Sequence, residues 1–114
     1  RSMIDAGGNG VEAAIAAMFC LGATNPQSSG LGGGFLMTLY NSSTGRCVAI
    51  DAREAAPGLA TETMFVNNSD AGMHGHLAVA VPSELAGYWE IFRRFGSGRL
   101  SWSQLVQPTI ESVE

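Results

Sequence analysis

Residues 35–52, FLMTLYNSSTGRCVAIDA, determine the fold class of this chain. Two mainly apolar stretches, 35–40 and 46–52, flank the turn-forming sequence NSSTG at positions 41–45. This pattern predicts a β-hairpin whose strands are joined by a five-residue loop. Because the first stretch is almost wholly apolar, we expect that strand to be buried on both faces.

Helical patterns precede the hairpin. A helical segment at residues 1–6 ends at a glycine pair, and Asn9 with Glu12 forms a capping box for a second helix from about Gly10 to Leu21. Asn25-Pro26 ends that helical region. The residues expected on the packed face of the second helix are Val11, Ala14, Ile15, Met18 and Phe19.

A short strand and two more helices are predicted after the hairpin. The strand covers residues 77–81, and Pro82 is expected at the first position of a helix that runs to about Phe95. Ser101 and Gln104 form a capping box for the last helix, which Pro108 interrupts or kinks. This order of elements indicates an α+β fold, because a doubly wound parallel sheet needs strands and helices in alternation.

Composition restricts the classes of partner. The chain has 114 residues, 46% hydrophobic, which is enough for the core of one small domain or of a piece of a larger one. All six basic residues are arginines and the net charge is −4, so no basic stripe is available for nucleic acid or an anionic membrane surface. Neither end carries a helix start or stop signal, so we expect residues 1–114 to come from a longer polypeptide.

The glycine cluster at residues 30–34, GLGGG, does not fit a nucleotide site. A dinucleotide fingerprint needs a further glycine where Phe35 stands, and it follows a strand rather than a helix. We therefore expect close backbone packing or a turn here. His74 and His76 lack a third ligand at zinc-site spacing, so no metal site is predicted. No serine lies in a nucleophile elbow, and no catalytic set can be assembled.

Arg53 is the candidate binding residue. It follows an apolar strand and lies beside Asp51 and Glu54. A guanidinium at a strand end is a planar fork that suits a carboxylate. The residues alone leave this role open against a salt bridge to either acidic neighbour or a solvated strand end.

The sequence also contains two candidate glycosylation sites and two cysteines. Asn41 and Asn67 each begin an Asn-X-Ser sequon in a turn-like stretch, which makes them candidate glycosylation sites of a secreted protein. Cys20 and Cys47 are expected to be buried free thiols.

Five segments, in order along the chain, resemble the early part of the large subunit of the γ-glutamyltransferase (glutathione hydrolase) family, animal type. The segments are GGNGVEAAIAA at 7–17, NPQSSGLGGGF at 25–35, DAREAAP at 51–57, VAVPSELAG at 79–87 and LSWSQLVQP at 100–108. Position 83 is serine where many members have glycine. The resemblance covers nearly the whole chain.

The resemblance implies part of an N-terminal-nucleophile hydrolase, an αββα sandwich, with residues 1–114 as a single partial domain. The family cleaves the γ-glutamyl amide of glutathione and its conjugates and passes the glutamyl group to water, amino acids or dipeptides, without a cofactor. The resemblance aligns Arg53 with the family's arginine that holds the α-carboxylate of the γ-glutamyl group. The partners that it implies are the remainder of the large subunit and the small subunit.

The catalytic threonine of the family belongs to the small subunit, and no threonine of this sequence matches it. No catalytic residue is therefore predicted here, and residues 1–114 alone are expected to be inactive. The resemblance also implies that Cys20 pairs with an earlier cysteine and that the protein is held on the extracellular face of the plasma membrane by an N-terminal anchor. The alternatives are a catalytically silent paralogue or truncated isoform with a structural or binding role, and a glutaryl or cephalosporin-type acylase.

Overall fold

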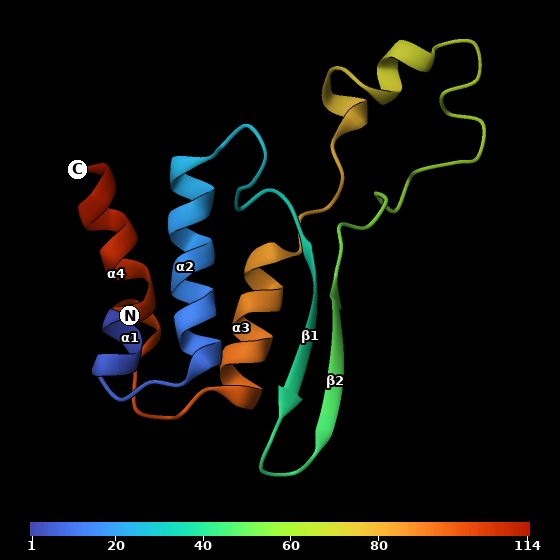
Figure 1. Ribbon diagram of the computed structural model, residues 1–114. Helices are drawn as coiled ribbons and strands as arrows, with labels where there is room; N and C mark the ends of the chain where they lie inside the picture. The colour runs from blue at the N-terminus through green and yellow to red at the C-terminus, as the bar shows by residue number, and fades with distance from the viewer.

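The computed structural model describes all of residues 1–114 as helices beside a two-stranded hairpin (Figure 1). The elements in chain order are α1 (Ser2–Asp5), α2 (Gly10–Thr24), β1 (Phe35–Asn41), β2 (Arg46–Ala52), the 3-10 turns η1 (Ser69–Gly72) and η2 (His76–Ala78), α3 (Glu84–Phe95) and α4 (Trp102–Val113). This confirms the α+β class. None of the helices is both long and apolar enough to cross a membrane.

The hairpin has the predicted antiparallel pairing, with Phe35 opposite Ala52 at one end and Asn41 opposite Arg46 at the other. Its loop has four residues, 42–45, instead of five, because Asn41 extends β1. The Asn41 side chain then accepts hydrogen bonds from the backbone N–H groups of Ser43 and Thr44. Gly45 supplies the positive φ of 66° that the turn requires.

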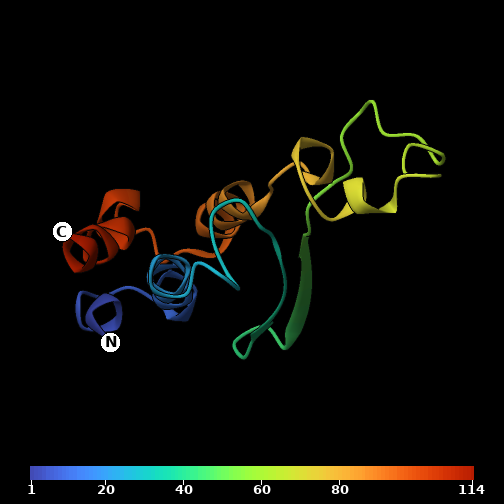
Figure 2. The same cartoon turned by 90° about the horizontal axis from the view of Figure 1, so that it is seen from above.

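The prediction that β1 is buried on both faces is wrong. Its residues alternate between half-buried and exposed, and Leu36 and Tyr40 are 70% and 65% exposed. Figure 2 shows the reason: the helices lie on one side of the hairpin, and the opposite face is uncovered. Among these residues, the sheet therefore has one packed face only.

α2 lies at the centre of the helical layer, and the capping box of Asn9 and Glu12 begins it as predicted. The helix runs to Thr24, three residues beyond the expected end, and stops before Pro26. The packed face is shifted from the predicted one: Glu12 and Ala16 are buried, whereas Ala14, predicted on that face, is exposed. The hydrophobic core consists of Met3, Val11, Ile15, Ala16, Phe19, Tyr88, Ile91, Leu100 and Leu105.

α3 connects this core to the hairpin. Gly87 permits the contact, because a Cβ there would lie 2.6 Å from the Ala52 side chain and 2.8 Å from the Phe35 ring. Tyr88 then stacks on Phe35, with 5.2 Å between ring centroids. This packing brings the start of α3 close to the ends of the strands that carry Phe35 and Ala52.

The ends of α3 and α4 differ in part from prediction. α3 begins at Glu84 with Ser83 as its N-cap, so Pro82 precedes the helix and is not its first residue. Ser101 and Gln104 form the predicted capping box of α4. Pro108 lies inside α4, which continues to Val113 without interruption.

The predicted strand at residues 77–81 is wrong. Residues 76–78 form the turn η2, and only Val81 pairs, in an isolated antiparallel bridge with Ala55. The connection between β2 and α3 extends away from the helices (Figure 1), so residues 77–80 have no neighbouring strand to pair with. A short run of β-favouring residues does not form a strand without such a partner.

Candidate functional site

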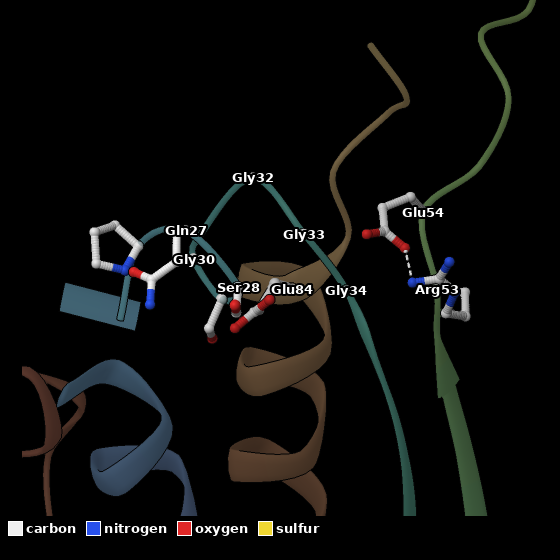
Figure 3. Close-up of a pocket in the computed structure, with 11 residues that line it drawn as sticks. Gln27, Ser28, Gly30, Gly32, Gly33, Gly34, Arg53, Glu54 and Glu84 are labelled. Atoms are coloured by element: carbon white, nitrogen blue, oxygen red, sulfur yellow. Dashed lines mark ion pairs between the residues drawn. The ribbon is translucent and has the colours of Figure 1, made fainter. Parts of the chain in front are cut away.

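Arg53 lies at the edge of a polar pocket of about 450 Å³, where the chain leaves β2. Because β1 and β2 are antiparallel, the end of β2 lies beside the glycine-rich segment that enters β1. No hydrophobic side chain lines the pocket (Figure 3). Its residues are Pro26, Gln27, Ser28, Ser29, Gly30, Gly32, Gly33, Gly34, Arg53, Glu54 and Glu84.

The glycine cluster provides close backbone packing, as predicted. A Cβ at Gly34 would overlap the carbonyl oxygen of Ala52 and lie 3.1 Å from the Cα of Arg53. The carbonyl oxygen of Gly33 accepts hydrogen bonds from the N–H groups of Ser83 and Glu84, at 3.2 and 3.1 Å. The segment therefore joins the end of β2 to the start of α3, and no larger residue fits at position 34.

Arg53 forms one ion pair. Its Nη1 lies 2.6 Å from Oε2 of Glu54, while 63% of the arginine side chain is exposed. This Glu54 oxygen is buried and has no aligned hydrogen bond, so the contact is electrostatic and poorly directed. Asp51 accepts from the backbone N–H of Arg53 at 3.0 Å. Of the two salt bridges left open by the sequence, only the one to Glu54 forms.

The guanidinium therefore remains available to a ligand. It carries five N–H donors in a planar fork, and none makes an aligned hydrogen bond within the chain. A carboxylate could bind it through two parallel hydrogen bonds, which are stronger and more directional than a single ion pair. The pocket can accordingly hold the acid group of a polar ligand.

Glu84 was not identified from the sequence as a pocket residue. It is buried, and the hydroxyl of Tyr88 donates a hydrogen bond to its Oε1. Burial, followed by the hydrogen bond and negative charge of Glu84, raises the pKa of Tyr88 well above its ordinary value of 10.0. Tyr88 therefore stays protonated and donates to Glu84. No local signal marks Glu84, because only the fold brings it to the pocket.

Two carboxyl groups flank the glycine segment. A Cβ at Gly33 would lie 3.1 Å from Oε2 of Glu84 and 3.6 Å from Oε1 of Glu54. Figure 3 shows Glu84 beside Ser28 on one side of this segment and the ion pair of Arg53 and Glu54 on the other. The pocket thus combines one accessible cation with two acidic side chains.

The other candidate residues do not join the pocket. Asn41 is exposed at the end of the hairpin opposite Arg53, and Asn67 is exposed with a φ of 67° in the long connection. Their glycosylation stays a prediction. His74 lies 3.0 Å from Asp70, and no group of three His, Cys, Asp or Glu residues is placed to hold a metal ion.

The two thiols have different surroundings. Cys20 is half-buried on α2, with its Sγ 3.1 Å from Oγ1 of Thr109 on α4. Cys47 is exposed on β2, so the prediction that it is buried is wrong, because it points to the uncovered side of the hairpin end. Both are free in this chain, and pairing of Cys20 with an earlier cysteine stays a prediction.

Curated relatives are similar to this chain over nearly all its length. Scoloptoxin SSD14 of Scolopendra dehaani is 46% identical over 110 residues, which are 96% of this chain and 19% of that protein. Glutathione hydrolase 5 proenzyme of Rattus norvegicus is also 46% identical, over 112 residues and the same shares. The chain thus spans about a fifth of the length of these relatives.

A solved structure has the same fold. The γ-glutamyltranspeptidase from Pseudomonas nitroreducens, complexed with L-DON, superposes with a TM-score of 0.90 at 38% identity. The superposition covers 99% of this chain and 34% of that one. The model of the family described as gamma-glutamyltranspeptidase matches residues 1–114. This chain therefore belongs to the γ-glutamyltranspeptidase family and has part of its N-terminal-nucleophile hydrolase fold.

Proposed function

We propose that residues 1–114 are the early part of the large subunit of a glutathione hydrolase and γ-glutamyltransferase. In this proposal the complete protein cleaves the γ-glutamyl amide of glutathione and its conjugates. It passes the glutamyl group to water, an amino acid or a dipeptide. The observation that carries the proposal is the accessible guanidinium of Arg53 at a pocket lined mainly by polar and glycine residues, within a fold shared with γ-glutamyltranspeptidases.

Arg53 binds the α-carboxylate of the γ-glutamyl donor. The poorly directed ion pair with Glu54 holds the guanidinium near the pocket without aligned hydrogen bonds, so a donor carboxylate can replace or share it. A charge-assisted hydrogen bond of this kind contributes roughly 1.5–3 kcal/mol. By fixing the acid end of the donor, Arg53 places its γ-amide at a constant distance from the reacting group.

The reacting group is a threonine of the small subunit, which self-cleavage exposes as a new N-terminus. Its hydroxyl attacks the γ-amide while its own α-amine acts as base, and the resulting acyl-enzyme transfers the glutamyl group to the acceptor. The word proenzyme in the name of the rat relative is consistent with such cleavage. Residues 1–114 then contribute donor binding and no catalytic group.

Arg53→Lys in the full-length protein tests this proposal. An ammonium keeps the charge but cannot grip a carboxylate through two parallel bonds. We expect KM for glutathione to rise about 10–100-fold, with a smaller change in kcat, because the lost contact binds the ground state and the transition state alike. Steady-state kinetics measures both constants.

Arg46→Lys is the matched control. Arg46 is also an exposed strand-end arginine of the hairpin, but it lies at the end opposite Arg53. Its substitution should leave KM unchanged. Equal KM values for the two variants and the unaltered protein would remove Arg53 from the donor site.

Two alternatives predict different behaviour of the complete protein. A glutaryl group keeps the carboxylate that Arg53 binds but lacks the α-amino group, so an acylase would prefer a glutaryl amide to glutathione. A silent paralogue would cleave neither substrate and would remain one band on a denaturing gel. A glutathione hydrolase should give two subunits and prefer glutathione.

The cellular setting is part of the same proposal. We propose a glycoprotein on the extracellular face of the plasma membrane, held by an N-terminal anchor outside residues 1–114. The exposed sequons at Asn41 and Asn67 support this, because a glycosyltransferase can reach both asparagines. A shift in gel mobility after deglycosylation of the full-length protein, absent from the Asn41→Gln and Asn67→Gln double variant, would test it.

A further inference from the structure

The peptide unit between Ala52 and Arg53 is held at both ends by side chains. The hydroxyl of Ser83 donates a hydrogen bond to the carbonyl oxygen of Ala52 at 2.6 Å. The Oδ1 atom of Asp51 accepts from the N–H of Arg53 at 3.0 Å. Because a peptide unit is planar, fixing its carbonyl and its N–H fixes its orientation, and with it the position of the Arg53 Cα from which the side chain extends.

Gly34 packs closely against this peptide unit from the side of β1. The position of its absent Cβ overlaps the Ala52 carbonyl oxygen and lies 3.0 Å from the backbone nitrogen of Glu54. The backbone around Arg53 therefore cannot shift toward β1. A shift in the opposite direction is opposed by the bond from Ser83 to the Ala52 carbonyl and by the bond to Asp51.

The Ser83 hydroxyl bonds to the Ala52 carbonyl and makes no helix-capping hydrogen bond. Ser83 is the N-cap of α3, and a serine there normally accepts a hydrogen bond from the second or third N–H of the helix. No such bond forms at Ser83, whereas Ser101, the N-cap of α4, accepts from the N–H of Gln104. The Ser83 hydroxyl is therefore directed to the residue before Arg53, and not to its own helix.

We propose that Ser83 is a positioning residue for donor binding, acting through the Ala52–Arg53 peptide unit, with Asp51 as the second support. The inference rests on the proposed function, because it takes Arg53 as the group that binds the α-carboxylate. Ser83 itself touches no substrate. It fixes the backbone from which the Arg53 side chain extends, so the donor does not have to order the arginine backbone on binding.

Ser83→Ala in the full-length protein tests the proposal. We expect KM for the γ-glutamyl donor to rise about 3–10-fold with kcat within about twofold, the pattern of lost donor binding. Ser83→Thr keeps the hydroxyl and should restore KM. Ser101→Ala is the matched control: it removes a helix-capping serine far from the pocket and should lower the melting temperature without changing KM.

A double-mutant cycle shows whether Ser83 acts through Arg53. In the Arg53→Lys background, Ser83→Ala should raise KM by less than about 1.5-fold, because the group that it positions is already gone. Asp51→Ala should raise KM as Ser83→Ala does, and Asp51→Asn, which keeps an acceptor oxygen, should not.

The outcomes separate this inference from the proposed function. If Arg53→Lys raises KM and Ser83→Ala does not, the role of Ser83 is refuted while that of Arg53 stands. The role of Ser83 is likewise refuted if Ser83→Ala raises KM equally in both backgrounds, or if Ser101→Ala raises it as much. An unchanged KM for Arg53→Lys would refute the proposed function and, with it, the role of Ser83.

Discussion

The position of Arg53 depends on a residue that has no side chain. Gly34 lies against the peptide unit that precedes Arg53, with no room for a Cβ beside the Ala52 carbonyl. A methyl group there would push β1 away from the end of β2 or rotate the Ala52–Arg53 peptide. The close contact at Gly34 and the hydrogen bonds from Ser83 and to Asp51 thus act on the same short stretch of backbone, residues 52–54.

Gly34→Ala should therefore destabilise the full-length protein by about 1–3 kcal/mol, the usual cost of overpacking, and should raise KM for the donor. Gly58→Ala is the control, because Gly58 lies outside the pocket and a Cβ there meets no atom within 4 Å. Denaturant midpoints and steady-state kinetics of the two variants provide the comparison. Equal midpoints would contradict the close contact at Gly34.

At the scale of elements, α3 links the pocket to the core through Tyr88 and Glu84. Tyr88 is fully buried between Phe19 and Phe35, with ring centroids at 5.1 and 5.2 Å. Its hydroxyl holds the carboxyl group of Glu84 at the pocket. The helix therefore transmits the packing of the core to the polar wall on which the donor would lie.

The raised pKa of Tyr88 predicts a loss of stability in alkali. The folded state keeps the tyrosine proton above the ordinary pKa of 10.0, where the unfolded chain loses it. The contribution of Tyr88 to stability is therefore fully present below about pH 10 and falls as the pH rises above that value. Melting temperatures between pH 8 and 11 would show the decline.

Tyr88→Phe is the matched variant for this test, because it keeps the ring and removes the titrating group. It should flatten the decline above pH 10 that is due to Tyr88, and it should cost about 1–3 kcal/mol at neutral pH by leaving the buried Glu84 without its donor. An alkaline decline identical in the two proteins would exclude Tyr88 as its source.

Local sequence patterns predicted the elements whose signals are local. The capping boxes at Asn9 and Ser101 formed as predicted, and the hairpin turn formed at residues 42–45, one residue shorter than predicted, because each of these signals acts within a few residues. The strand expected at 77–81 failed because pairing depends on a distant neighbour that those residues cannot specify. Pro82 was assigned to the helix because its missing N–H suits a first helical position, but Ser83 is the N-cap.

The candidate site was predictable only in part, for the same reason. Arg53 and the glycine cluster stand out locally, by charge and by composition. Glu84 enters the pocket because Gly87 lets α3 approach Ala52 and Phe35, and this contact joins residues far apart in sequence. The role of Ser83 could not be predicted from local sequence either, since its hydroxyl bonds to the distant Ala52 and not to its own helix.

The whole molecule has the form of one helical layer against one hairpin. The extents of residues 1–114 are 54 × 39 × 18 Å. The uncovered hairpin face carries the exposed side chains of Leu36 and Tyr40. An αββα sandwich, which the family resemblance implies, has a second sheet and a second helical layer. The pocket at Arg53 lies where the chain leaves β2, at the end of the hairpin opposite its turn.

A crystal structure of the full-length protein with bound glutamate would show directly whether Arg53 holds the donor. Donor binding by Arg53 predicts both α-carboxylate oxygens of the ligand at about 2.7–3.1 Å from its guanidinium nitrogens, with the glutamyl side chain extending along the glycine segment. A ligand bound elsewhere, with Arg53 turned to bulk water or paired with Glu54 alone, would contradict it.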